Sequence, residues 1–98
     1  MKKLQEKLEI DTYNQQRLED AKERVEKSPT SSNYFWLGYE YQKIKEHEAA
    51  LENYTKAIEL DEKYADPYNG RGNVYEALKE YDKAKADFAK AKELDTGN

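Results

Sequence analysis

The chain has 98 residues, of which 39% are Asp, Glu, Lys or Arg and 37% are hydrophobic, and its formal net charge is −4. This length allows one domain or a short run of repeats, and the acidic balance argues against nucleic acid as a partner. No apolar run approaches the ~20 residues that a membrane span requires. The first residues also lack the apolar stretch of a secretory signal, so we expect a cytoplasmic protein without membrane contact.

Few residues suited to chemistry are present. The absence of cysteine excludes disulfides and thiolate chemistry, and a single histidine, His47, excludes a multi-histidine metal site. Glu46 and Glu48 flank His47, but a solvated helix start explains this cluster better than acid–base catalysis. The segment Gly70-Arg71-Gly72 lacks the third glycine and the preceding strand of a dinucleotide-binding loop. We therefore expect no enzyme activity, no catalytic residue, no metal and no cofactor.

Residues 1–30 are expected to form an N-terminal helical segment. Their apolar side chains follow a roughly helical stripe: Leu4, Leu8, Leu18, Ala21 and Val25. One interpretation is a continuous helix from Lys2 to Lys27. The other is two helices, the second opened at Asp11 or Thr12, and it is favoured because Thr12-x-x-Gln15 has the form of a capping box. The turn formers and caps of residues 28–33 mark a clear boundary after this segment.

Four further helices are predicted over residues 32–45, 47–60, 66–78 and 81–94. Asp66 is expected to cap the third of these helices, with Pro67 in the first turn, where a missing N–H does no harm. Tight turns at residues 45–46 and 79–80 make the helices of each pair antiparallel neighbours. The fold class predicted is therefore all-α.

An internal repeat covers the last two thirds of the chain. Sliding the sequence by 34 residues superposes residues 31–64 on residues 65–98 without a gap, and eleven positions are identical. The identities include Tyr34 with Tyr68, Gly38 with Gly72, Tyr41 with Tyr75, Ala50 with Ala84, and Ala57 with Ala91. A fixed period of this length is typical of stacked helical repeats.

The repeat resembles the tetratricopeptide repeat (TPR) family, whose pattern is W-x₂-L-G-x₂-Y, then A-x₃-F, then P. The first unit reads Tyr34-x-x-Leu37-Gly38-x-x-Tyr41, then Ala50-x₃-Tyr54 and Ala57. The second unit reads Tyr68-x-x-Arg71-Gly72-x-x-Tyr75, then Ala84-x₃-Phe88 and Ala91. Tyrosine replaces the leading tryptophan in both units, and Glu62 and Thr96 replace the closing proline. The resemblance implies a TPR-like α-solenoid of antiparallel helix-turn-helix repeats.

Small residues explain the pattern physically. Gly38 with Ala50, and Gly72 with Ala84, are expected to let the two helices of each repeat approach closely. Aromatic side chains at Tyr41 and Tyr54, and at Tyr75 and Phe88, would then fill the space beside these contacts.

The two units differ where a stack would end. Three apolar residues of the first unit become lysines in the second: Ala49 becomes Lys83, Leu51 becomes Lys85, and Ile58 becomes Lys92. Because a last repeat must cover its outer face, we expect residues 65–98 to be the terminal repeat and the array to end at Leu94. Residues 1–30 are left with three roles: a cap in cis, a segment exchanged with a second copy, or an adaptable segment in the groove.

The resemblance implies that the first helix of each repeat lines a concave groove for peptide partners. The matching positions are Phe35, Tyr39, Gln42 and Lys43 in the first repeat, and Asn69, Asn73, Glu76 and Ala77 in the second. Spacings of i, i+4 and i+7 place each set on one helix face. Trp36 either covers residues 1–30 or belongs to an aromatic binding surface. Arg71 either packs its stem beneath a solvated head or contacts a ligand.

The function predicted from these residues is a protein-binding adaptor or scaffold whose partner is a peptide or a helical segment. The alternative is a structural self-association module, a homodimer joined by residues 1–30 and the aromatic cluster. One branch of the family grips C-terminal carboxylates. We do not expect that activity, because Asn69 stands where the branch has lysine, and Trp36 and Gly70 stand where it has asparagine.

Overall fold

A computed structural model describes residues 2–96 as five α-helices, and no strand occurs among these residues. Their bounds are α1 Lys2–Lys27, α2 Ser31–Lys43, α3 His47–Leu60, α4 Ala65–Ala77 and α5 Tyr81–Thr96. Helices α2 to α5 confirm the four predicted from the repeat, with ends that differ by two residues or fewer. Residue 1 of the predicted N-terminal segment and residues 97–98 of the predicted second repeat lie outside the described residues. No helix within residues 2–96 has the length and apolar character needed to cross a membrane.

The expectation of two helices in residues 1–30 is wrong, because α1 runs unbroken from Lys2 to Lys27. Thr12 does not cap a new helix, since its hydroxyl donates to the carbonyl of Leu8, one turn earlier, at 2.9 Å. Gln15 likewise donates along the helix, to Glu19 at 3.1 Å. Residues 2–27 contain no glycine or proline, so a local capping pattern had no backbone break to support it.

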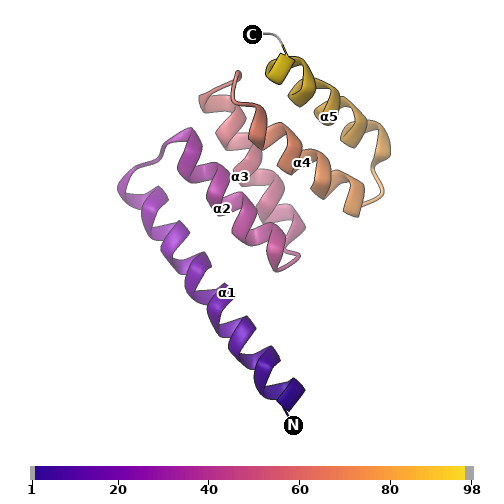
Figure 1. The fold of residues 1–98 in the computed structure, drawn as a ribbon. Helices are drawn as coiled ribbons and strands as arrows, with labels where there is room; N and C mark the ends of the chain where they lie inside the picture. Colours follow the sequence, from indigo (N-terminus) through magenta and orange to yellow (C-terminus); the bar gives the residue numbers. More distant parts are fainter. Residues whose placement is uncertain (1, 97–98) are drawn as a thin grey trace.

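The boundary after α1 forms as expected. Thr30 is the N-cap of α2, and its side-chain oxygen accepts from the backbone N–H of Asn33 at 3.1 Å. The Asn33 amide donates in turn to the carbonyl of Ser28 at 2.8 Å. These bonds hold the turn after which α2 runs back along α1 (Figure 1).

The cap expected at Asp66 is not formed, because α4 already begins at Ala65 with Tyr64 as its N-cap residue. Asp66 lies in the first turn instead, where its carboxylate faces the positive end of the helix dipole. Pro67 does lie in that first turn, as predicted.

Both tight turns within the repeats use the same backbone device. Lys45 and Lys79 adopt the left-handed conformation, with φ of 62° and 63°. After each, the N–H of Glu46 or Glu80 donates to a carbonyl near the end of the preceding helix, at 3.0 and 2.9 Å. This helix ending reverses the chain and makes α2 antiparallel to α3, and α4 antiparallel to α5.

The buried ring of Tyr54 lies between two glycines on different helices. Tyr54 on α3 is 0% exposed. A Cβ added at Gly38 on α2 would lie 2.8 Å from this ring, and a Cβ added at Gly70 on α4 would lie 2.5 Å from it. Both distances are too short for a real side chain. Tyr54 therefore joins the helix pair of the first repeat and also docks the second repeat onto it.

The second repeat has a similar contact between an aromatic ring and a glycine, but with one glycine instead of two. A Cβ at Gly72 would lie 2.7 Å from the ring of Phe88 on α5. Ala50 and Ala84 are 0% and 3% exposed, which confirms the close approach predicted at both pairs of small residues.

Only the second half of α1 is packed against the body of the protein. Leu18 and Ala21 are buried against Leu37 of α2, with Val25 and Tyr41 beside them. Residues 2–12 are all exposed. This first half of α1 projects away from the other four helices (Figure 1).

Candidate peptide-binding face

The first helices of the two repeats, α2 and α4, contact each other directly. We call the surface that they share the α2–α4 face and define it by eight residues. These are Phe35, Tyr39, Gln42 and Lys43 on α2, and Asn69, Asn73, Glu76 and Ala77 on α4. All four residues of α4 are exposed.

The α2 residues of this face are less accessible than those of α4, because two of them contact other side chains of the protein. Phe35 is half-buried, and its ring packs against the rings of Tyr54 at 5.8 Å and Tyr64 at 5.6 Å. The side-chain oxygen of Gln42 accepts a short hydrogen bond from the Tyr54 hydroxyl. Burial raises the pKa of Tyr54, so this hydroxyl stays protonated and donates. Phe35 and Gln42 therefore stabilise the fold, which leaves Tyr39, at 40% exposure, as the accessible aromatic of the predicted α2 set.

Trp36 extends the aromatic surface toward α1. Its ring contacts those of Phe35 and Tyr39 edge-on, at centroid distances of 4.9 and 5.7 Å. It is 45% exposed and also lines a cavity between α1 and α2. Both interpretations of Trp36 thus describe part of its environment.

The guanidinium of Arg71 is held inside the protein. Its Nε and Nη2 donate to the two carboxylate oxygens of Asp87 at 2.8 Å each, and its Nη1 donates to the hydroxyl of Thr55 at 3.2 Å. The hydrogen bonds to Asp87 raise the pKa of Arg71. The stem packs as expected, with the guanidinium within 6.0 Å of two tyrosine rings. Since Arg71 links α3, α4 and α5, we leave it out of the proposed binding set.

Residues of α1 join this side of the molecule, which sequence reasoning missed. The ammonium of Lys43 lies 5.5 Å from the ring centre of Tyr39 and 5.8 Å from that of Tyr13 on α1. It also lies 2.8 Å from a carboxylate oxygen of Glu40. No signal in residues 1–30 placed Tyr13 here, because the position of that segment relative to the repeats was open. Within residues 2–96, no three acidic, histidine or cysteine side chains gather to hold a metal ion.

Antiparallel helix pairs that recur along the chain and stack on their neighbours are the architecture of helical-repeat proteins. Residues 38–79 match a family model described as TPR repeat, and residues 65–98 match one described as tetratricopeptide repeat. The chain belongs to the tetratricopeptide repeat family, and at that level it is a protein-interaction module. No curated protein matches it by sequence.

Solved structures share the fold. A crystal structure of MamA protein is 30% identical with a TM-score of 0.79, over 86% of this chain and 46% of that one. MamA 41-end from Desulfovibrio magneticus RS-1 is 23% identical, with a TM-score of 0.81, over 93% and 51%. The second TPR of Spaghetti (RPAP3), bound to HSP90 peptide SRMEEVD, is 24% identical, with a TM-score of 0.78, over 83% and 76%. This chain thus spans about half the length of the MamA structures.

Proposed function

We propose that the chain is a protein-binding adaptor that holds a peptide or a helical segment along the α2–α4 face. The observation that carries this proposal is a row of exposed polar side chains on α4, Asn69, Asn73 and Glu76, together with the exposed aromatic Tyr39 on the neighbouring helix α2. Amide side chains can both donate to and accept from a peptide backbone. A neighbouring aromatic surface supplies the apolar contact from which interfaces gain most of their energy.

The chemistry of this face favours binding over catalysis. Its exposed groups are amides, one carboxylate, an ammonium and an aromatic ring, and the eight residues that define it include no serine, cysteine or histidine. The partner proposed is a protein or peptide, in the cytoplasm, and no cofactor is needed. We do not propose the HSP90 peptide that the RPAP3 domain holds as a partner of this chain, since Asn69, Trp36 and Gly70 depart from the carboxylate-gripping pattern.

Removing one contact from each helix tests the proposal. Against a peptide selected on the wild-type protein from a random display library, Tyr39→Ala with Asn73→Ala is expected to weaken binding at least ~30-fold, because two central contacts are lost. Calorimetric titration gives the dissociation constants, and circular dichroism checks that the helices are intact. Phe35 is unsuitable for this test because it also packs against Tyr54.

The matched control is Lys83→Ala with Lys90→Ala, which removes two side chains of α5 that are 62% and 43% exposed and that do not line the surface hollow shared by Glu76, Lys85 and Lys92. This variant is expected to bind the selected peptide within a factor of about two of the wild type. A full loss of binding in the α5 variant, with no loss in the α2–α4 variant, would overturn the assignment of the face.

A second candidate function, self-association, is favoured by the projecting half of α1. Four of its large hydrophobic residues are about 60% exposed: Leu4, Leu8, Ile10 and Tyr13. Exposed apolar groups on an unpacked helix are typical of an interaction surface. Sedimentation velocity across a range of protein concentrations separates the two candidates: a concentration-independent monomer excludes a homodimer, and a stable dimer supports it.

A further inference from the structure

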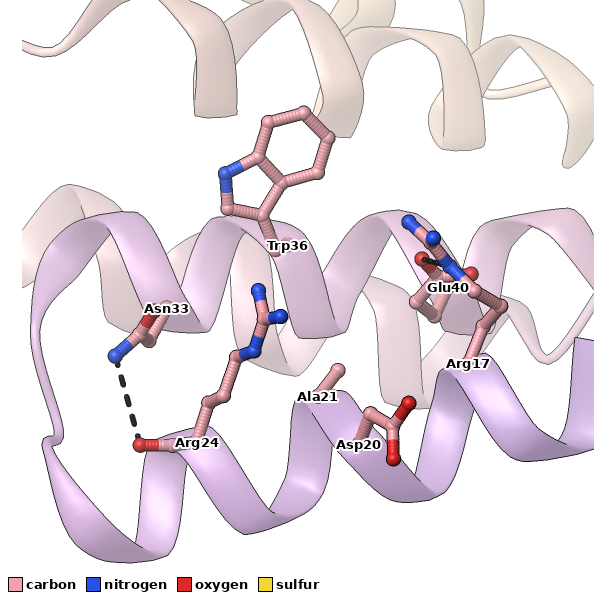
Figure 2. A pocket seen from close by; sticks show the side chains of 7 residues that line it. All are labelled: Arg17, Asp20, Ala21, Arg24, Asn33, Trp36 and Glu40. Atoms are coloured by element: carbon pink, nitrogen blue, oxygen red, sulfur yellow. Dashed lines mark hydrogen bonds and ion pairs between the residues drawn. The ribbon is translucent and has the colours of Figure 1, made fainter.

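A cavity of about 250 Å³ lies between α1 and α2, next to the α2–α4 face. Figure 2 shows the residues that line it: Arg17, Asp20, Ala21 and Arg24 from α1, and Asn33, Trp36 and Glu40 from α2. Trp36 stands at its edge and also contacts Tyr39, so the cavity is continuous with the aromatic part of the α2–α4 face. We call it the α1–α2 cavity.

The α1–α2 cavity is open because the junction of α1 and α2 lacks an aromatic ring that the junction of α3 and α4 contains. At the junction of α3 and α4, the ring of Tyr54 lies directly over Gly70. Gly70 corresponds to Trp36 by the repeat period of 34 residues. The turn before α2 is one residue shorter than the turn before α4, so Tyr54 corresponds to Ala21, which is likewise buried. Ala21 is too small to fill the space, and the indole of Trp36 is 45% exposed. The α1–α2 junction thus lacks the aromatic side chain that completes the next junction.

A buried carboxylate lies at the α2 wall of the cavity. Glu40 is 3% exposed, at the position where the second repeat has Val74. Its Oε2 receives only a long contact from the Nε of Arg17, at 3.5 Å. Its Oε1 has no accessible surface and is paired with the ammonium of Lys43 at 2.8 Å. Oε2 is therefore the oxygen that a donor from an occupant would reach, since its contact with Arg17 is at the limit of hydrogen-bonding distance.

The charges around the cavity select the kind of donor. Arg17 and Arg24 carry two positive charges, which Asp20 and Glu40 balance. A cationic occupant would meet both guanidinium groups, and an anionic one would meet the buried Glu40. A neutral donor meets neither penalty. In Figure 2 the side chain of Arg24 reaches toward the indole of Trp36, so two flat groups flank the opening.

We propose that the α1–α2 cavity takes the side chain of a tyrosine from the bound partner. The phenol ring would replace the ring that Tyr54 supplies at the next junction, stacking against Trp36, and its hydroxyl would donate to Glu40. This inference rests on the proposed function for the source of the tyrosine. The internal contact of Tyr54, a buried ring whose hydroxyl donates to a side-chain oxygen of α2, shows the same chemistry within this fold.

The test uses a small probe that does not require the rest of the face. N-acetyl-tyrosinamide is titrated into the protein while NMR follows the indole N–H of Trp36, the chain's single tryptophan. A saturable shift is expected. N-acetyl-phenylalaninamide is expected to bind about tenfold more weakly, because it lacks the hydrogen bond to a charged acceptor. N-acetyl-lysinamide is expected to leave the resonance unchanged.

Two variants keep the result interpretable. Ala21→Tyr places a ring at the position that corresponds to Tyr54, and it is expected to fill the cavity and abolish the shift. Glu40→Val installs the residue of the second repeat, and it is expected to remove the preference for the tyrosine probe over the phenylalanine probe. Thermal unfolding checks that both variants are folded. No saturable shift in the wild type, or an unchanged shift in folded Ala21→Tyr, overturns the inference.

Failure of this inference is distinct from failure of the proposed function. If the tyrosine probe leaves Trp36 unmoved while Tyr39→Ala with Asn73→Ala still loses the selected peptide, the cavity assignment is wrong and the binding face stands. If the probe binds while the selected peptide is insensitive to that variant, the cavity assignment stands and the face is wrong.

Discussion

Replacing Tyr54 with alanine is expected to lower the free energy of unfolding by about 4 kcal/mol, the middle of the range for truncating a buried aromatic. The ring is 0% exposed and fills the space above both Gly38 and Gly70, so its removal opens a cavity on two helix contacts at once. Urea denaturation followed by circular dichroism measures the change. In a domain of ordinary stability this is a large fraction of the total.

The matched control is Tyr81→Ala, which removes a tyrosine that is 61% exposed on α5. Its expected effect is within about 0.5 kcal/mol, as for most surface substitutions. Tyr54→Phe keeps the ring and loses only the hydroxyl bond to Gln42, so it is expected to cost about 1 kcal/mol. Equal losses in Tyr54→Ala and Tyr81→Ala would contradict the role given to this ring.

Asp87→Ala is expected to be the second most damaging change, at about 2.5 kcal/mol. The carboxylate of Asp87 is 8% exposed and accepts two hydrogen bonds from Arg71, whose side chain is 20% exposed. Its loss leaves the guanidinium partly buried without its charged partner. Breaking a fully buried pair costs about 3–5 kcal/mol, and the partial exposure of Arg71 lowers the figure. The same urea denaturation measures it.

The residues of the first repeat suggest a double substitution that should preserve stability. Where the second repeat has Arg71 and Asp87, the first has Leu37 and Asn53. Asn53 satisfies its own amide by donating to the carbonyl of Ala49 at 2.8 Å. The double variant Arg71→Leu with Asp87→Asn is therefore expected to lie within about 1 kcal/mol of the wild type, since it removes both charges together. A double variant less stable than Asp87→Ala would show that the ion pair is not interchangeable with the apolar pair.

The repeat period predicted the four helices of residues 31–96 well, because matched glycines, alanines and tyrosines report one packing arrangement twice. The contact between the ring of Tyr54 and Gly70, which links the two repeats, was not predicted. Gly70 lies one position before Arg71, and in the sequence it reads as a loosened helix start. The available signal was its alignment with Trp36, since a glycine opposite a large aromatic indicates that something else occupies that space in the second repeat.

The environment of charged residues was the least predictable part. Arg71 and Asp87 are sixteen positions apart, and they meet only because α4 and α5 are antiparallel. The replacement of Leu37 and Asn53 by this pair was visible, but its geometry was not. Glu40 could be flagged as unusual beside Val74, yet its burial depends on α1. The position of α1 follows from the contact of Leu18 and Ala21 with Leu37, which no periodic pattern specifies.

The proposed binding face depends on α2 and α4 being held together by one ring, and NMR tests this most directly. Cross-relaxation between the ring protons of Tyr54 and the α protons of the two glycines reports both contacts in solution. We expect strong cross-peaks to Gly38 and to Gly70 in the same protein. Cross-peaks to Gly38 alone would show that α4 is not docked on this ring, and the shared α2–α4 face would then not exist.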